Sequence, residues 1–511
     1  MRSDRHEKQE KQVKKKGTLQ FKLIALIYII VAILFSVILL KLNVIPLKYA
    51  IMFFAAIVLM SILILPPLFK TKGARFTKWV CFVLALALIV GFGVGTKYMG
   101  VTLSTLKDVT SIDEIPTEDF YVVVRDDATY DDKGNELTPP TYQELSSISG
   151  ETVGTYMSKE TTYSEAKAIL QENVPIQYAY EENAFDLMSK LLSNEYNAIL
   201  VSAATYQGYT VESETVKEKT RILYTIPIEI VVKDNTTKVD VTKESFNIYI
   251  SGADADNSRA DVNMVATVNP VKHEVLLTSI PRDYYVELPT KASFDKLTHA
   301  SLYGVQESIG AIENLLGIDI NYYVKVNYNS LVNIIDAIGG VDVVSEYTFT
   351  TSGMAKEGLN GYHFVKGNNH LDGRAALAFS RERHSFSAGD MQRNKNQQLV
   401  LEAVIKKATQ SSTILTSYGQ ILSAVNGNFE TNMSQDEMSA IIKKQLEGMP
   451  SWNIDKQSIV GVPSAAPCYA LGGMNASIVK QDPESNALAL DGIIKAMMIK
   501  EVNEEENNVE N

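Results

Sequence analysis

Carboxylates and arginines follow several predicted strands in the second half of the chain. Ser251–Asp254 comes directly after one strand, Arg259–Asp261 lies shortly beyond it, and Pro281–Asp283 follows a later strand. Loops that follow strands can converge at one edge of a sheet. Two neighbouring carboxylates suit a Mg²⁺ ion that shares phosphate oxygens, and several guanidinium groups suit a diphosphate because each can bind it bidentately.

A second group of such residues lies further along the chain. Arg381-Glu382-Arg383 is followed by Gly389–Arg393 and then by Asn396-Gln397-Gln398. In an extended stretch, Arg381 and Arg383 would face the same way, as a paired clamp requires. Each residue alone could equally form a surface ion pair. As a set they are a stronger indication of a phosphate site than any one of them. Their spacing alone does not decide between a phosphate site and surface ion pairs.

The elements that position these residues are predicted between 245 and 410. Strands are expected at Phe246–Ile250, Val262–Val268, Val275–Ile280 and Tyr322–Val326, and a further strand begins at Gly340–Val344. Helical apolar stripes comprise Val305, Ile309, Ile312 and Leu316, then Leu331, Ile335 and Ile338, with Gly317 and Gly339 as stops. Strands that alternate with helices predict an α/β domain around a central sheet.

Two further regions flank this domain. Residues 113–235 are predicted to form an α/β unit with strands at Phe120–Val124, Asn197–Ser202 and Ile222–Val232 and helices at Tyr163–Leu170 and Ala184–Leu192. This unit has no Gly-rich phosphate loop and no nucleophile–His pair, so we expect a folded accessory domain. Residues 411–499 continue the main domain with helices and a loop at Pro463–Gly473, and residues 500–511 form an acidic disordered tail.

The N-terminal region is predicted to be a membrane module. Within residues 23–98, the uncharged stretches Leu23–Leu40, Tyr49–Phe69 and Trp79–Thr96 hold 18, 21 and 18 residues, near the length that crosses a bilayer. Eight Lys/Arg precede the first stretch, four lie between the second and third, and two lie between the first and second. This bias places the basic tail, residues 1–22, in the cytoplasm and the chain from about residue 100 outside.

Charge and cysteine content exclude several classes of protein. The net charge is −12, although residues 1–98 hold 15 Lys/Arg and only 3 Asp/Glu. The rest of the chain is therefore strongly acidic, which argues against nucleic-acid binding. Only two cysteines occur, Cys81 and Cys468, which excludes a disulfide scaffold and a multi-cysteine zinc site. The histidines lack metal-ligand spacing and are assigned no role: His273, His299, His363, His370 and His384.

The order of these motifs resembles the LytR–CpsA–Psr family, most closely its streptococcal capsule-type members. The likeness rests on Asn247–Gly252, Asp254, Arg259–Asp261, Thr278–Asp283, Lys296–Ala300, Ile338–Val343, His370–Ala376, Arg381–Arg383, Gly389–Gln398 and Tyr469–Met474. The resemblance implies an α/β catalytic domain and a phosphotransferase. Such enzymes move a glycopolymer from an undecaprenyl-diphosphate carrier to peptidoglycan, usually with Mg²⁺.

The resemblance also implies roles for individual residues. Asp254 and Asp261 correspond to the carboxylates that bind Mg²⁺ or Mn²⁺. Lys296, Arg393 and Gln397 correspond to substrate-binding positions, and Asp390 is a candidate base. The diphosphate clamp would comprise Arg259, Arg282, Arg381 and Arg383. Ala260 stands where the family more often has Ser, which could alter the metal shell.

The expected protein is thus a membrane-anchored, extracellular phosphotransferase of a Gram-positive-type envelope, acting on a capsule-type or teichoic-acid-type polymer. Its expected partners are the lipid-linked polymer, peptidoglycan, the membrane and capsule synthesis or export proteins, but not nucleic acid. The lipid would need an apolar groove, which the two helical stripes could line, although such stripes are ordinarily core. Two alternatives stay open: a lipid-diphosphate-binding regulator without transferase activity, and a polyprenyl diphosphatase. Intact Asp254 and Asp261 favour an enzyme over a binder.

Overall fold

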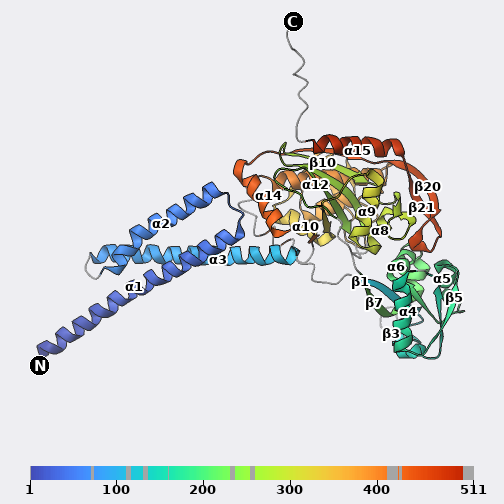
Figure 1. Cartoon of the computed structure of the whole chain (residues 1–511), viewed down its shortest axis with the longest axis horizontal. Helices are drawn as coiled ribbons and strands as arrows, with labels where there is room; N and C mark the ends of the chain where they lie inside the picture. The colour runs from blue at the N-terminus through green and yellow to red at the C-terminus, as the bar shows by residue number, and fades with distance from the viewer. Residues whose placement is uncertain are drawn as a thin grey trace, which may run out of the picture.

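The computed structural model describes residues 2–70, 74–110, 117–130, 136–158, 160–230, 236–253, 259–410, 420, 424 and 429–498. Figure 1 shows long N-terminal helices on one side, a large α/β unit, and a smaller α/β unit at its far end. The predicted fold class, three apolar helices followed by α/β units, is confirmed. The predicted acidic tail, residues 500–511, lies outside the described part of the chain.

The N-terminal helices are α1 (Arg2–Leu42), α2 (Leu47–Phe69) and α3 (Arg75–Thr110). Each contains a segment long and apolar enough to cross a membrane: Leu19–Leu42, Leu47–Phe69 and Arg75–Val101. The buried helix contacts include the small residues Ala25, Ala32 and Ala85, which let helix backbones approach closely in a membrane. Tyr28 and Ser61 share a hydrogen bond of 2.9 Å between α1 and α2.

The smaller unit, here called the accessory domain, has a five-stranded sheet in the order β5-β4-β6-β1-β7. Apolar clusters cover both faces, one under α4 and the other under α5 and α6. Its elements are β1 (Thr117–Arg125), β2 (Thr129–Tyr130), β3 (Glu136–Thr138), η1 (Leu145–Ile148), β4 (Thr152–Tyr156), α4 (Thr161–Asn173), β5 (Gln177–Glu181), α5 (Ala184–Leu192), β6 (Ala198–Ser202), α6 (Ala203–Glu212), α7 (Glu214–Lys219) and β7 (Thr220–Glu229).

The larger unit, here called the main domain, has a six-stranded mixed sheet in the order β18-β13-β8-β9-β10-β19. Strand β8 pairs parallel with β13 and antiparallel with β9, and β10 pairs antiparallel with β9. The strands are β8 (Phe246–Ala253), β9 (Ala260–Asn269), β10 (Glu274–Ile280), β13 (Tyr322–Val326), β18 (Phe429–Thr431) and β19 (Asn453–Ser458). The C-terminal ends of β8, β10 and β13 therefore lie at the same edge as the start of β9.

Helices cover the two faces of this sheet differently. One face carries a continuous core with α9 (Val305–Leu316) and α15 (Pro483–Met497). The other face is covered by α10 (Tyr328–Ala337), α11 (Gly373–Arg381) and α12 (Asp390–Ala408).

The main domain also contains smaller elements: β11 (Tyr285–Leu288), β12 (Ser293–Lys296), α8 (Leu297–Ala300), η2 (Ser301–Tyr303), β14 (Val341–Ser345), β15 (Phe349–Thr350), β16 (His363–Phe364), β17 (Gly367–Leu371), β20 (Gly461–Pro467), η3 (Tyr469–Leu471) and β21 (Asn475–Gln481).

Two local predictions were wrong, and one predicted strand has an unexpected partner. The strand expected to begin at Gly340–Val344 is β14, which pairs with β17 and lies outside the central sheet. The loop expected at Pro463–Gly473 begins as strand β20, which pairs with β21 in a two-stranded sheet; prolines are tolerated at such an edge. The stretch from Asp390 onward, grouped with loops, is helix α12.

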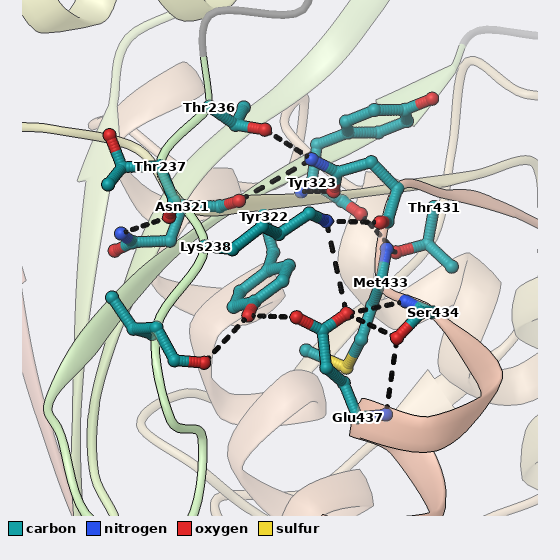
Figure 2. A network of polar contacts seen from close by, with 12 residues as sticks. Thr236, Thr237, Lys238, Asn321, Tyr322, Tyr323, Thr431, Met433, Ser434 and Glu437 are labelled. Atoms are coloured by element: carbon teal, nitrogen blue, oxygen red, sulfur yellow. Dashed lines mark hydrogen bonds and ion pairs between the residues drawn. The ribbon is translucent and has the colours of Figure 1, made fainter.

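Helix α14 (Gln435–Gly448) joins the main domain to the membrane helices. Met438, Ile442 and Leu446 pack on Leu42, Val44 and Met99, and Lys48 Nζ donates to the Glu447 carbonyl at 2.9 Å. Figure 2 shows how the start of α14 is fixed to β13: the buried Tyr322 hydroxyl donates to Glu437 at 2.6 Å, and the Ser434 side chain caps the helix.

The accessory domain contacts the main domain through η3 and the turn before β12. The Tyr209 hydroxyl donates to the Leu471 carbonyl at 2.8 Å, and the Tyr469 hydroxyl donates to Glu160 at 2.6 Å. Lys291 Nζ lies 2.9 Å from the same Glu160 carboxylate. These contacts fasten the accessory domain beside the loop that carries η3. In Figure 1, α6 lies next to one end of β20 and β21.

Candidate functional site

A cavity of about 740 Å³ lies between the sheet and the helices α10–α12. One part is charged, and the remainder is lined by apolar side chains from the sheet and the three helices. The apolar lining includes Ile250, Val262, Met264, Val324, Val326, Leu331, Ile334, Leu377, Val400, Leu401, Val404 and Phe429. Of the two helical stripes expected to line an apolar groove, the one on α10 contributes Leu331 to the cavity lining, whereas its Ile335 and Ile338 are packed in the core. The stripe on α9 is packed in the core on the opposite face.

Asp261 and Arg282 form the central ion pair of the charged part. Asp261 lies near the start of β9 and Arg282 just beyond the end of β10, and Arg282 NH1 donates to Asp261 Oδ1 at 2.8 Å. Burial alone would raise the pKa of Asp261, but the charges of Arg282 and Arg393 outweigh it and hold the pKa below its usual value. Asp261 therefore remains an anion at the cavity.

Asp390, at the start of α12, forms ion pairs with three arginines. Its carboxylate accepts from Arg393 at 2.7 Å and lies 3.8 Å from Arg282 Nε and 3.9 Å from Arg383 NH1. These ion pairs occupy the carboxylate, so they do not favour Asp390 as the candidate base.

Arg381 and Arg383 both line the cavity, but not for the reason expected. The predicted extended stretch is wrong, because α11 continues through Arg381. The buried Glu382 sets the turn instead: its carboxylate accepts from the backbone N–H groups of Ser352 at 2.7 Å and Ser385 at 2.8 Å. Arg381 lies over the Tyr328 ring, 4.3 Å from its centroid. Two arginines therefore converge because a buried carboxylate anchors the residue between them.

Several buried guanidinium donors at the cavity have no hydrogen-bond partner among the described residues. They are Arg282 Nε, Arg381 NH1 and Arg393 Nε. Buried donors are nearly always satisfied, and an unsatisfied one costs about 1–3 kcal/mol or more when charged. Burial, together with the like charges of Arg282 and Arg383, also lowers the pKa of Arg393. The arrangement therefore suits an anion that accepts several hydrogen bonds.

The remaining predicted residues fall into two groups. Arg259, Lys296 and Gln397 all line the same cavity. Asp254 lies outside the described residues, so its position relative to Asp261 is not defined. Within the described part of the chain, no three His, Cys, Asp or Glu side chains cluster as a metal site. An anionic Asp261 with one further carboxylate would fit Mg²⁺, which keeps several waters and shares phosphate oxygens.

Sequence reasoning missed three contributors. Glu382 anchors the paired arginines, Tyr328 stacks on one of them, and His299, which was assigned no role, lines the cavity while hydrogen-bonded to Asp295. The four-residue spacing of Asp295 and His299 would have placed them together only on a helix. They in fact lie at the end of β12 and on α8, where no periodic signal exists.

Comparisons with known proteins identify the family of this chain. The LytR–CpsA–Psr family model matches residues 205–484. A Bacillus anthracis protein named polyisoprenyl-teichoic acid–peptidoglycan teichoic acid transferase TagU is 40% identical over 238 residues, which cover 46% of this chain and 74% of that protein. A protein of the same name from Enterococcus faecalis is 34% identical over 221 residues, covering 42% and 70%.

Among solved structures, B. subtilis TagU is 28% identical, with a TM-score of 0.39 over 51% of this chain and all of that one. The family match covers more than half of the chain and includes the described residues of the charged cavity. On the strength of that match, this chain belongs to the LytR–CpsA–Psr family.

Proposed function

We propose that this protein is a membrane-anchored phosphotransferase that moves a glycopolymer from an undecaprenyl-diphosphate carrier to peptidoglycan outside the cell. The observation that carries the proposal is the set of unmatched buried guanidinium donors at one end of a cavity whose other lining is apolar. A lipid diphosphate has the matching chemistry: an anionic group with many acceptor oxygens, attached to a hydrocarbon chain. The names of the relatives support a transferase of this type.

The charge balance of the cavity supports a diphosphate over a neutral ligand. Among the described residues, its lining contains six cationic side chains and three carboxylates: Arg259, Arg282, Lys296, Arg381, Arg383 and Arg393 against Asp261, Asp283 and Glu357. Arginine binds phosphate oxygens through a fixed pair of donors, whereas lysine acts as a point charge. The polyprenyl chain would lie along the wall that α10 and α12 form with β8, β9 and β13.

The reaction follows from this arrangement. A sugar hydroxyl of peptidoglycan attacks the phosphorus that carries the glycan, a new P–O bond forms, and the P–O bond to undecaprenyl phosphate breaks. Arg282, Arg381 and Arg383 would offset the negative charge that develops on the phosphoryl oxygens. Asp254 and Asp261 would hold Mg²⁺ or Mn²⁺, which when bound supplies further neutralisation of those oxygens.

We place residues from about 100 onward outside the cell. Helix α14 of the main domain packs against the connection between α1 and α2 and against the C-terminal part of α3. These parts therefore lie on the same side of the membrane. The Lys/Arg bias puts the N-terminus in the cytoplasm. Protease added to intact protoplasts should digest the main and accessory domains, and protection of both would contradict this topology.

The polymer is proposed to be a teichoic-acid-type or capsule-type chain. The relatives named above favour teichoic acid, and the cavity residues themselves recognise only the shared lipid diphosphate. A polyprenyl diphosphatase is the second candidate, because water could replace the sugar hydroxyl at the same phosphorus. The wide cavity beside the charged end, about 740 Å³ in all, gives room for either nucleophile.

The test uses the full-length protein in lipid nanodiscs with a lipid-linked polymer, Mg²⁺ and purified peptidoglycan. We expect polymer bound covalently to peptidoglycan, loss of transfer with a chelator, and loss by about 100-fold or more in Asp261→Asn. Glu181→Gln in the accessory domain is the matched control, because it also removes a carboxylate paired with a cation.

The outcomes separate the candidates. Polymer–peptidoglycan product that requires Asp261 supports the transferase. Free polymer phosphate released at the same rate with and without peptidoglycan would identify a diphosphatase instead. Tight lipid-diphosphate binding with neither product would identify a binder and overturn the proposed enzyme.

A further inference from the structure

His299 and Asp295 form a buried pair that opens onto the charged cavity. His299 Nδ1 lies 2.7 Å from Asp295 Oδ1, and the two side chains are 1% and 0% exposed. His299 nevertheless belongs to the lining of the cavity that Arg282 and Asp261 also line. A histidine that is shielded from bulk water but borders the proposed reaction site has the position of a proton acceptor.

The surroundings of Asp295 decide which ring nitrogen carries the proton. Asp295 Oδ1 accepts the Lys296 N–H at 2.7 Å, and Oδ2 accepts the Ala470 N–H at 2.7 Å. A carboxylate held by backbone donors is stabilised as an anion, and an ionised carboxylate only accepts hydrogen bonds. His299 Nδ1 must therefore donate to Asp295. In the neutral ring Nε2 is then the basic nitrogen, and no described residue hydrogen-bonds to it.

Two hydrogen bonds place α8 and the residue after it next to the ion pair at the cavity. The Thr298 N–H donates to the Arg282 carbonyl at 2.8 Å, and the Ser301 hydroxyl accepts from the Ala260 N–H at 2.9 Å. The residue before His299 is thus bonded to Arg282 itself, and the residue two positions after it to the neighbour of Asp261. The histidine is presented where the phosphate-binding arginines converge.

We propose that His299 is the general base of the transfer, with Asp295 as its positioning residue; this inference rests on the proposed function above. Nε2 takes the proton of the attacking sugar hydroxyl as its oxygen bonds to phosphorus, and undecaprenyl phosphate leaves with the electrons of the broken P–O bond. The Asp390 carboxylate is engaged by three arginines, whereas no described residue forms a hydrogen bond to Nε2 of His299. Nε2 therefore has its lone pair available for the proton.

The accessory domain reaches this pair through η3. Tyr209 of α6 binds the Leu471 carbonyl, and the adjacent Ala470 N–H holds Asp295. The orientation of the His299 ring thus depends on a short segment held between the two domains. This gives the accessory domain a structural role in the site although none of its described residues lines the cavity.

Other titratable groups face this pair from the surrounding elements. Burial and the neighbouring Asp295 carboxylate raise the pKa of the Cys468 thiol to about 12. The same two causes raise the pKa of Tyr303 well above its usual value. Neither group therefore changes charge near neutral pH. The charged or titratable groups that interact with Asp295 are Lys296 on β12, Tyr285 on β11, Tyr303 on η2 and Cys468 beside η3. Asp261 and Arg282 share the cavity lining with His299.

The experiment compares His299→Gln, His299→Ala and a matched control in the nanodisc transfer assay. The control is His370→Gln, because His370 forms the same type of pair with Asp342, at 2.8 Å, but is exposed and outside the cavity lining. We expect His299→Gln to lower kcat by about 10²–10⁴-fold with little change in the KM for the lipid substrate. Added imidazole should partly restore His299→Ala, and His370→Gln should behave as wild type.

The pH profile gives a readout that does not depend on how the variants fold. Wild-type kcat should fall as the pH is lowered from neutral through the mildly acidic range, because a protonated imidazole cannot accept the proton of the hydroxyl. A flat wild-type profile over that range would overturn the inference. So would wild-type transfer by His299→Gln, or a folded His299→Ala that imidazole does not restore. Absence of transfer by the wild-type protein would instead overturn the proposed function, and the inference with it.

Discussion

Arg125 in the accessory domain and Arg282 in the main domain both lie at the end of a buried strand, but their guanidinium groups have different surroundings. Arg125 donates to the carbonyls of Leu191 at 3.0 Å and Tyr196 at 2.6 Å and to the Asn197 side chain at 3.1 Å. Arg282 pairs with Asp261 but keeps Nε buried and unmatched. An arginine at the end of a strand therefore indicates a ligand site only where some of its N–H donors border a cavity and lack a hydrogen-bond partner in the described protein.

The same contrast holds for the two sheets. Both faces of the accessory sheet are filled by apolar clusters under helices. In the main domain one face is filled in the same way, whereas the helices on the other face stand over the cavity. The two α/β units thus differ mainly in whether helices pack directly on the second face of the sheet or leave a cavity over it. The four predictions below test this difference.

The largest effect is expected from Arg282→Lys compared with Arg125→Lys. Lysine keeps the charge but lacks the forked donors, so Arg282→Lys should lower transfer by about 10²–10³-fold while the fold persists. Arg125→Lys should leave transfer unchanged and lower the free energy of unfolding by about 1–3 kcal/mol, because it loses bonds to carbonyl oxygens. Transfer rates and denaturant unfolding in detergent would measure both. Equal losses of transfer would remove the proposed distinction.

A smaller effect is expected from Arg381→Lys. The flat Arg381 guanidinium stacks on Tyr328, which lysine cannot reproduce, so transfer should fall by about 10–100-fold and become more sensitive to ionic strength. The control is Arg374→Lys on the same helix. Arg374 is exposed and contacts only the carbonyls of Glu357 and Gly358. If both variants transfer equally well at all salt concentrations, Arg381 does not bind the diphosphate.

Adding a methyl group at the contact between the two domains should have a still smaller effect. A Cβ on Gly472 would lie 2.8 Å from Ala184 Cβ in the accessory domain, whereas a Cβ on Gly473 would meet nothing within 4 Å. Both glycines have positive φ angles, so the backbone strain of an alanine is matched. Gly472→Ala should lower kcat by roughly three- to tenfold by displacing η3, and Gly473→Ala should not. Equal kcat values would show that the accessory domain does not position the site.

The smallest effect concerns acid stability. The folded-state pKa of Asp261 is lowered, against burial, by Arg282 and Arg393, and that of Glu181 is lowered by hydrogen bonds from Lys190 and Tyr196. A lowered carboxyl pKa adds stability above the unfolded value, about 4, and this stability is lost as pH falls through the folded value. The free-energy difference between wild type and Asp261→Asn, or Glu181→Gln, should therefore shrink as pH falls from about 6 to 3. A constant difference in denaturant unfolding would contradict these pairings.

Much of the architecture could be predicted from local sequence patterns. The uncharged stretches predicted three spans, and the helix predicted at Ala184–Leu192 is α5. Such patterns work where burial follows a period of 2 or 3.6 residues. They also predicted the strand that begins at Gly340–Val344, but periodicity does not say which strand is its partner, and β14 pairs with β17 outside the central sheet.

The candidate site was predictable as a set of residue types, not as an arrangement. Carboxylates and arginines after strands indicated one sheet edge, and Asp261, Arg282 and Arg383 do line one cavity there. The predicted geometry of Arg381 and Arg383 was wrong, because a helix end and the buried Glu382 set their positions. The pair of His299 and Asp295 was missed, because neither residue lies on a regular helical face with the other.

The sequence by itself determined the membrane helices, the α/β class and the inventory of charges, because these depend on composition and short-range periodicity. Only the tertiary structure decided which charges are matched within the protein and which are left for a ligand. Arg125 and Arg282 look alike in the sequence, and their difference arises from carbonyls and carboxylates that distant segments bring to them. Matching of buried donors is a property of packing in three dimensions, so no local pattern encodes it.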